Sequence, residues 1–238
     1  MRGRRARTRV GTACSGFRWR SLGVPQGTIG GPNLWNLLMS EMLEQLGSDW
    51  ADAWSDFVAY ADDLIVYVEE DADAEGEARA EAKLNQALAM VESWSSDRNM
   101  KVSSEKTTYS VFSREEGDLP ELSLALGAEK IRYERCPKYL GVVLDPMLDF
   151  GAQVNKTLAK CRRRLGAIRR LAGASWRPRT RHIRMLYTAV VESVLYYGAG
   201  VWAPCLGAKA RDKVDKFQAE AAGVVFGVRV GRDAEALM

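Results

Sequence analysis

The sequence predicts an α+β fold that is followed by an all-helical region. Residues 57–68 form an almost continuous apolar run that is interrupted only by Asp62 and Asp63, as expected for two strands joined by a turn. Elsewhere apolar residues recur at a helical period of about 3.6, and the last third of the chain shows this period alone. The pattern indicates an α+β part over residues 1–145 and a helical part over residues 146–238.

The elements before the acidic pair are a short β structure and a helix. Residues 10–22 indicate two short strands around a turn at residues 14–16. The triplet at residues 30–32 opens a helix, because its proline suits the first helical position. One apolar face is predicted for this helix: Leu34, Leu37, Leu38, Met42 and Leu46.

The acidic pair is expected to join two buried strands, because both flanks are apolar. A second helix should follow and end near residues 97–99, with Ala80, Leu84, Leu88 and Val91 on one face. Residues 107–112 and 138–144 each indicate a short strand. Between them, residues 122–126 should turn at Gly127-Ala128 and pair with residues 131–133.

The helical part shows three apolar stripes, each the expected buried face of one helix. The stripes are Leu158, Cys161, Leu165, Ile168 and Ala172; Ile183, Leu186, Tyr187, Val190 and Val194; and Ala210, Val214, Phe217, Ala221 and Val224.

The composition excludes several classes of protein. With 47% apolar and 27% charged residues, the 238-residue chain is globular rather than disordered. Its four cysteines are far apart and His182 is its single histidine, which excludes a zinc finger or knuckle within the chain. No apolar run has the length of a membrane span, and the arginine-rich start lacks the apolar core of a signal peptide. We expect a soluble, intracellular protein with reduced cysteines and no membrane partner.

Basic residues gather in two acid-free stretches, although the net charge is only +3. The first twenty residues hold seven arginines, and residues 156–184 hold eleven lysines and arginines. A solvated helix face is one explanation of such segregation. The excess of arginine over lysine favours the other explanation, a face that meets nucleic acid.

The Asp62-Asp63 pair is the strongest candidate for chemistry. An isolated acidic pair at a turn is usually a solvated hairpin tip. Here the apolar flanks would place both carboxylates at the rim of a buried sheet, where a cation is needed to offset their repulsion. Mg²⁺ prefers such hard oxygen ligands and takes substrate phosphates as further ligands. Two carboxylates rarely hold two ions, so a third acid is expected from elsewhere.

Three further segments are weaker evidence of a functional site when each is considered alone. Residues 23–27, Gly-Val-Pro-Gln-Gly, indicate a rigid turn that brings the backbone and Gln26 close to a ligand. Lys106 precedes a strand, where a lysine is most often a solvated surface residue. Residues 139–142, Tyr-Leu-Gly-Val, match a buried strand with one glycine for close approach.

Taken in their order along the chain, the acidic pair and these three segments resemble the palm motifs of reverse transcriptases, in particular those of non-LTR (LINE-type) retrotransposons. The helical segments 186–187, 195–198, 201–202 and 213–218 are similar to the region that follows the palm in these elements. The palm segments are residues 23–28 with 31–36 (motif B), 57–63 (motif C, Tyr-Ala-Asp-Asp), 99–107 (motif D) and 138–145 (motif E).

The resemblance implies two-metal nucleotidyl transfer by an RNA-directed DNA polymerase that uses an RNA template, a DNA primer and dNTPs. Mg²⁺, or Mn²⁺, would be the cofactor if a third carboxylate is supplied. The residues that it implies are Asp62 and Asp63 as metal ligands and catalytic residues; Lys106 near the triphosphate; Gln26 and Gly27 along the template–primer; Tyr139, Leu140 and Gly141 as the primer grip; and Lys156, Lys160, Arg163, Arg164 and Arg170 on a thumb-like helix that tracks phosphates.

The chain departs from the family pattern upstream of motif B. Family members carry motif A, with another metal-binding aspartate, before motif B, whereas this chain has no acid before Glu41. We therefore expect a truncated copy or a piece of a longer protein, inactive in isolation. The alternatives are a non-catalytic nucleic-acid-binding remnant and a maturase-like RNA-splicing cofactor.

Overall fold

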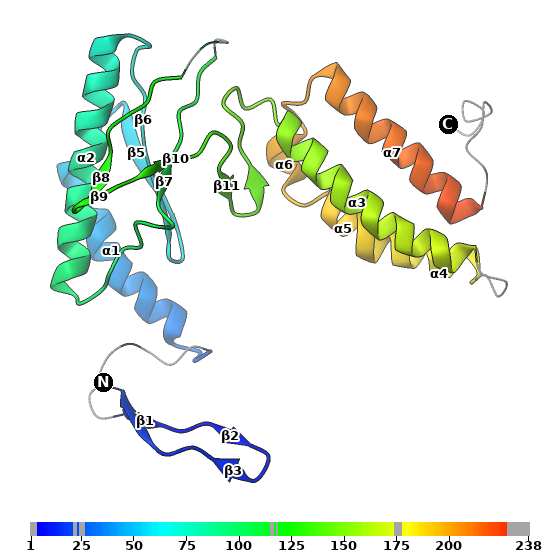
Figure 1. The fold of residues 1–238 in the computed structure, drawn as a ribbon, viewed down its shortest axis with the longest axis horizontal. Helices are drawn as coiled ribbons and strands as arrows, with labels where there is room; N and C mark the ends of the chain where they lie inside the picture. The colour runs from blue at the N-terminus through cyan, green and yellow to red at the C-terminus, as the bar shows by residue number, and fades with distance from the viewer. Residues whose placement is uncertain are drawn as a thin grey trace. The chain divides into compact units, whose positions relative to one another are not determined.

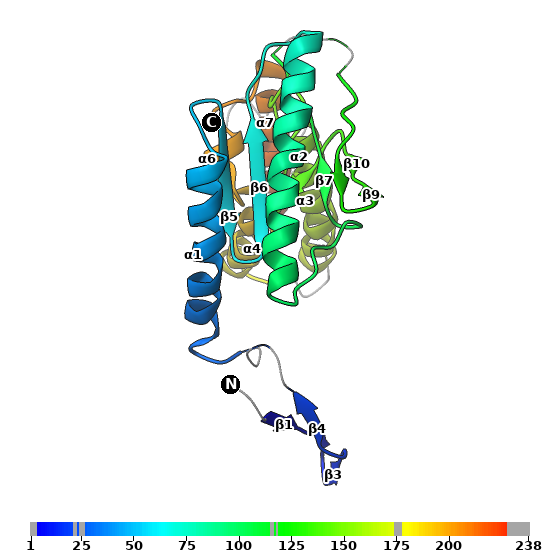
Figure 2. The same ribbon diagram turned by 90° about the vertical axis from the view of Figure 1, so that its left-hand side faces the viewer.

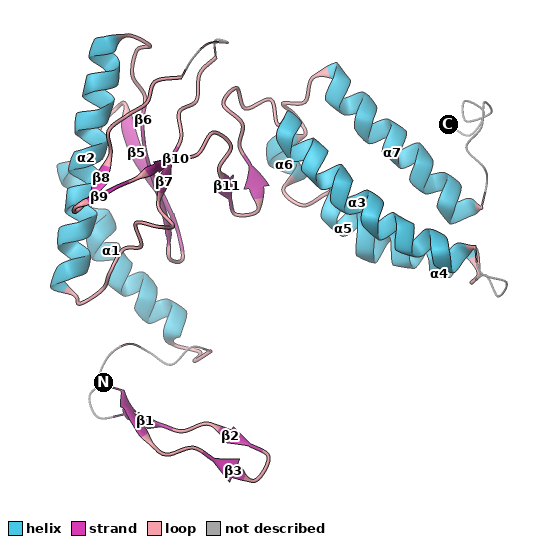
Figure 3. Cartoon of the chain, viewed as in Figure 1, coloured by secondary structure: helices cyan, strands magenta, loops and turns pink. Residues whose placement is uncertain are grey.

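A computed structural model of the chain confirms the α+β prediction. It consists of two compact units, described here one at a time: the first spans residues 1–102 and 124–129, and the second spans residues 103–123 and 130–238. Up to residue 143 the chain contains strand pairs and two long helices, and only helices follow in the later part that the structure describes (Figure 3). The residues that the structure describes are 4–20, 23, 27–114, 117, 119–173 and 178–227.

The first unit begins with an exposed hairpin over residues 4–20, in which β1 pairs with β4 and β2 pairs with β3. Its turn lies at Gly11-Thr12, so the prediction of a turn at residues 14–16 is wrong. Gly11 has a φ of +59°, a left-handed conformation that glycine adopts without steric cost. The strands are β1 (Arg4–Ala6), β2 (Arg9–Val10), β3 (Ala13–Cys14) and β4 (Arg18–Arg20).

The core of the first unit lies between two helices and the hairpin that carries the acidic pair (Figures 1 and 2). Trp50 and Trp94 are its largest buried members, and the inward side chains of the hairpin pack against it. The elements are α1 (Gly31–Asp49), β5 (Ser55–Tyr60), β6 (Asp63–Val68) and α2 (Ala74–Asp97).

The helix boundaries agree with the local signals. Pro32 lies in the first turn of α1, as predicted. The side chain of Asp73 accepts a hydrogen bond from the Gly76 amide at 2.7 Å and so caps α2, which ends within the predicted range. The predicted apolar face of α1 is partly wrong, because Leu34 and Leu37 are exposed while Met39 is buried.

Two ion pairs connect the elements of this unit. Arg98 pairs with Glu41 at 2.6 Å and joins the end of α2 to α1. Lys83 of α2 pairs with Asp52, and its hydrogen bond holds the pKa of that carboxyl well below its usual range. Asp52 also accepts a hydrogen bond from Ser55 at 2.8 Å, so this network fixes the start of β5.

Short strand pairs complete the α+β part. The predicted strand at 107–112 is reduced to two residues, and it pairs in parallel with residues 132–133. The turn at Gly127-Ala128 is confirmed, but the strand after it that pairs with residues 125–126 is residues 129–130 rather than 131–133. These strands are β7 (Thr108–Tyr109), β8 (Ala125–Leu126), β9 (Glu129–Lys130) and β10 (Arg132–Tyr133).

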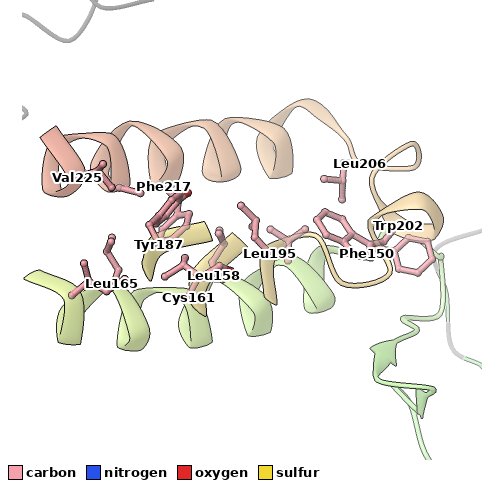
Figure 4. Close-up of a cluster of buried hydrophobic side chains, with 14 of the residues drawn as sticks. Phe150, Leu158, Cys161, Leu165, Tyr187, Leu195, Trp202, Leu206, Phe217 and Val225 are labelled. Atoms are coloured by element: carbon pink, nitrogen blue, oxygen red, sulfur yellow. Dashed lines mark hydrogen bonds between the residues drawn. The ribbon is translucent and has the colours of Figure 1, made fainter. Parts of the chain in front are cut away.

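The second unit is built around a helical core that centres on Phe217 (Figure 4). The first and third predicted stripes face this core. The second does so only in part: Val190 is exposed, and Val191 and Leu195 are buried instead. A turn of π-helix at residues 188–192 adds a residue to the turn and rotates the later positions. The helices are α3 (Gly151–Ala172), α4 (Thr180–Tyr187), η1 (Thr188–Glu192), α5 (Ser193–Leu195), α6 (Ala199–Trp202) and α7 (Ala208–Phe226).

Candidate active site

The acidic pair lies at the tip of the β5–β6 hairpin. Tyr60 and Asp63 are the last paired residues, and the connecting turn consists of Ala61 and Asp62. Both carboxylates are exposed. The hairpin tip therefore offers two exposed carboxylates from consecutive residues, the donor type that Mg²⁺ prefers.

The two strands are half-buried rather than fully buried, so this part of the prediction is wrong. Side chains alternate between the two faces of a strand, and only one face of this hairpin contacts the core. On the other face Val58, Tyr60 and Tyr67 are exposed, Tyr60 by 62%. Asp63 lies directly opposite Tyr60 in the register and hence on the same open face.

A tryptophan of the motif B segment, which was not predicted as a site residue, holds the turn. Trp35 of α1 donates a hydrogen bond from Nε1 to the carbonyl of Ala61 at 2.7 Å. Ala61 has a φ of +55°, a left-handed conformation that costs a non-glycine residue about 1–2 kcal/mol. The bond thus fixes the residue at which the turn is strained. In the sequence, Trp35 lies in the segment 31–36 that resembles motif B, just after the helix start at Gly31-Pro32.

Replacing Trp35 with phenylalanine should loosen this turn. The change keeps an aromatic ring but removes the donor, which should cost about 1 kcal/mol and speed local amide exchange at Asp62 and Asp63 roughly fivefold. Hydrogen exchange followed by NMR measures the effect. Trp54→Phe is the matched control, because Trp54 is exposed and lies in the same unit. Equal acceleration in both variants would contradict a specific role for Trp35.

The other predicted site residues lie elsewhere in the chain. Gln26 lies outside the described residues, whereas Gly27 precedes α1 and has a φ of +84°. Lys106 is exposed in a turn of the second unit that Thr107 closes with a hydrogen bond to the Ser103 carbonyl at 3.0 Å. The structure therefore groups Asp62 with Asp63, and it describes Lys106 within another unit.

Residues 138–143 form a hairpin instead of the single strand that was predicted. Its strands are β11 (Lys138–Tyr139) and β12 (Val142–Val143), and Leu140 and Gly141 form the turn. Both turn residues have positive φ, 43° and 91°, which ends a strand. Tyr139, Leu140 and Gly141 are thus adjacent at one hairpin tip in the second unit.

Helix α3 carries a stripe of cations opposite its buried face. Lys156, Lys160, Arg163 and Arg170 are exposed, and at about 100° per residue they lie on one side of the helix over roughly 20 Å. No ion pair is found for them among the described residues. Arg164, also predicted, differs: its guanidinium donates to the Val190 carbonyl at 2.6 Å.

Two other arginines of α3 form ion pairs with a carboxylate of α7. Arg169 pairs with Glu220 of α7 at 2.7 Å, and Arg162 lies 3.8 Å from the same carboxylate. The helix therefore has one face whose charges are compensated and one whose charges are open to solvent.

Metal-binding groups are limited within the described part of the chain. No three His, Cys, Asp or Glu side chains there lie close enough together to hold an ion. The hairpin tip offers two carboxylates, which fit Mg²⁺ in donor type and leave its other ligand positions to further groups. Of the described helices, none is both long and apolar enough to cross a membrane.

Comparison with known proteins relates the chain to polymerases of mobile elements. A sequence profile of the family described as "Reverse transcriptase (RNA-dependent DNA polymerase)" matches residues 7–144. The chain is 29% identical over 182 residues to the 115 kDa protein of the type-1 retrotransposable element R1DM of Drosophila melanogaster. It is 26% identical over 186 residues to the Pol polyprotein of the R1 element of Nasonia vitripennis, and 26% identical over 203 residues to the RNA-directed DNA polymerase of the mobile element jockey of Drosophila melanogaster.

These matches cover most of the chain but less of the relatives. They include 76%, 76% and 82% of the chain, and 17%, 52% and 20% of the three relatives, respectively. No solved structure matches the chain significantly. The match to the family profile contains the acidic hairpin tip, the turn at Lys106 and the hairpin at residues 138–143.

Proposed function

The chain belongs to the reverse transcriptase family of RNA-dependent DNA polymerases, and from this membership we propose that it is a part of the polymerase of a non-LTR retrotransposon. In this proposal residues 1–145 belong to the palm and residues 146–238 form a thumb-like region. The observation that carries it is the Asp62-Asp63 turn, which lies within the profile match and offers two exposed carboxylates at a hairpin tip.

The proposed chemistry is nucleotidyl transfer at this tip. Asp62 would be the principal ligand of Mg²⁺ or Mn²⁺, and Asp63 a weaker or outer ligand. When bound, the ions supply positive charge to the attacking and leaving oxygens of an in-line displacement. The hairpin itself would orient the two carboxylates, and Trp35 would hold the turn at Ala61, just before them.

The other residues are proposed to bind the substrates that the family uses, a nucleic-acid template and primer and dNTPs. Gln26 and Gly27 would lie along the template–primer. Lys106 would approach the triphosphate and neutralise or protonate the pyrophosphate leaving group. The turn at residues 139–141 would hold the primer 3′ end in line for attack.

Metal binding by the full chain tests this proposal. Mn²⁺ can be titrated by EPR into the chain with an RNA template, a DNA primer and a dNTP. Because Asp62→Asn removes a ligand, the Mn²⁺ affinity should fall at least about tenfold. Asp56→Asn is the matched control, since Asp56 is an exposed carboxylate of the same hairpin, paired with Tyr67 away from the tip.

The outcomes distinguish catalytic from purely binding functions. An Mn²⁺ affinity that is indifferent to Asp62→Asn would overturn the proposed site. Primer extension by the isolated chain is expected to be undetectable, because two carboxylates rarely hold two ions. Incorporation that Asp62→Ala abolishes would contradict this inactivity and would support the polymerase assignment.

A second candidate function is non-catalytic binding of nucleic acid. The cation stripe of α3 favours it, since four exposed basic side chains on one face suit a phosphate backbone. A chain with this function would bind duplex in a salt-dependent manner, and Asp62→Asn would change neither the affinity nor its salt dependence.

A further inference from the structure

The hairpin proposed to grip the primer is held from the helical region. Tyr197, which follows α5, donates a hydrogen bond from its hydroxyl to the carbonyl of Leu140 at 2.8 Å. Leu140 is the first residue of the turn and has a φ of +43°, which is strained for a branched side chain. The bond therefore acts on the residue whose conformation defines the turn.

Two glycines allow the close contact. A Cβ atom on Gly141 would lie 2.8 Å from Cε1 of Tyr197, and a Cβ atom on Gly198 would lie 2.8 Å from Cγ2 of Val142. Both glycines also have positive φ, 91° and 63°. The turn and the Tyr197-Gly198 segment thus fit together from both sides only because neither glycine has a side chain.

The tyrosine segment is itself anchored to the core of the second unit. The carbonyl of Tyr197 accepts a hydrogen bond from Nε1 of Trp202 at 3.0 Å, and Trp202 is buried in the helical core. The hairpin has its own anchors, because Val142 belongs to the same core and Gln153 of α3 accepts a hydrogen bond from the Val143 amide at 2.9 Å. The Tyr197 hydroxyl therefore bonds to the turn from a fixed position.

We propose that Tyr197 is a positioning residue that holds the Leu140-Gly141 turn in the shape that receives a primer 3′ end. The proposal rests on the proposed function, because that function assigns the primer to this hairpin. It gives a role to the Tyr196-Tyr197-Gly198 segment, which the assigned site does not use. Tyr197 acts through its bond to the turn rather than on the substrates themselves.

The test uses the full chain with Tyr197→Phe, which removes the donor and keeps the ring. Tyr196→Phe is the matched control, because the two tyrosines are 55% and 56% exposed and the Tyr196 hydroxyl accepts its bond from Gln218, away from the hairpin. Amide exchange in residues 138–143 should accelerate about fivefold in Tyr197→Phe and stay unchanged in Tyr196→Phe. Gly141→Ala, which forces a Cβ against the ring, should accelerate it further.

A second readout reports the primer. An RNA template with a DNA primer that carries a photoreactive 3′-terminal nucleotide is cross-linked to each variant, and duplex affinity is measured in parallel. Cross-links from the primer 3′ end to residues 138–143 should fall in Tyr197→Phe, with duplex affinity within twofold of wild type, roughly the effect of a few tenths of a kcal/mol. If Tyr197 only stabilised the fold, Tyr197→Phe would not lower the 3′-terminal cross-link while leaving the duplex affinity unchanged.

Each result of the exchange and cross-linking experiments bears on one part of the proposal. Unchanged exchange in Tyr197→Phe would overturn the positioning role, whatever the cross-link shows. Accelerated exchange with an unchanged 3′-terminal cross-link would also overturn it, since the turn would then not serve the primer. Absence of this cross-link in the wild-type chain, with normal duplex binding, would instead overturn the proposed primer site, and with it the role of Tyr197.

Discussion

A chain in which Lys156, Lys160, Arg163 and Arg170 are all replaced by glutamine is expected to lose most of its affinity for an RNA–DNA duplex. Each phosphate contact contributes about 0.7–0.9 to the slope of log K against log salt, so four lost contacts should reduce that slope by roughly 3. Glutamine, lysine and arginine have similar helix propensities, so α3 should persist. Fluorescence anisotropy titrations between about 50 and 200 mM salt measure the slope.

The matched control lies on the same helix. Arg162→Gln with Arg169→Gln removes two cations that already pair with Glu220, so the slope should change little. Circular dichroism should show both proteins folded. A similar loss of slope in the control would mean that net charge, rather than this face, determines binding. An unchanged slope in the fourfold variant would refute the stripe as a phosphate-binding surface.

Phe217→Ala should destabilise the second unit by about 3–5 kcal/mol, the usual cost of removing a buried aromatic ring. Phe217 is 0% exposed and lies among the side chains of α3, α4 and α7 (Figure 4). The ring therefore leaves a cavity that its packed neighbours fill only in part. Urea unfolding followed by circular dichroism should show a lower midpoint for the transition that includes these helices.

Phe226→Ala is the control, because it makes the same substitution in the same helix without removing a side chain from the core. Phe226 is the last residue of the same helix and is 63% exposed, so its loss should stay within about 0.5 kcal/mol of wild type. Comparable destabilisation by the two substitutions would contradict a core centred on Phe217. The two units can unfold separately, so the midpoint is assigned by comparison with Trp94→Ala, a change in the core of the first unit.

Much of the local structure follows from local signals. Pro32 and Asp73 mark helix starts because their backbone and side-chain chemistry acts within one turn. The acidic pair between apolar flanks predicted a hairpin with the acids at its tip, and the register places them there. The stripes that begin at Leu158 and Ala210 predicted buried helix faces, because a regular helix keeps a constant period.

Other features depend on distant partners. Residues 138–144 have the composition of one strand, yet Tyr197, which is far along the chain, bonds to a turn in its middle. The π-helical turn at residues 188–192 moves Val190 outward and Val191 inward, which no count at a constant period foresees. Tertiary context decides both because the competing local conformations differ by only about 1 kcal/mol.

For the site, the sequence by itself determined the family, the two carboxylates and the basic character of α3. The order of the motifs and the type of each residue can be read from the amino-acid sequence, so neither depends on how the chain folds. Only the tertiary structure decided that Trp35 supports the Ala61 carbonyl, that Arg162 and Arg169 are compensated by Glu220, and that one face of the β5–β6 hairpin is open. The first two are contacts between segments far apart in the chain, and the open face depends on which side of the hairpin packs against the core, so only folding decides all three.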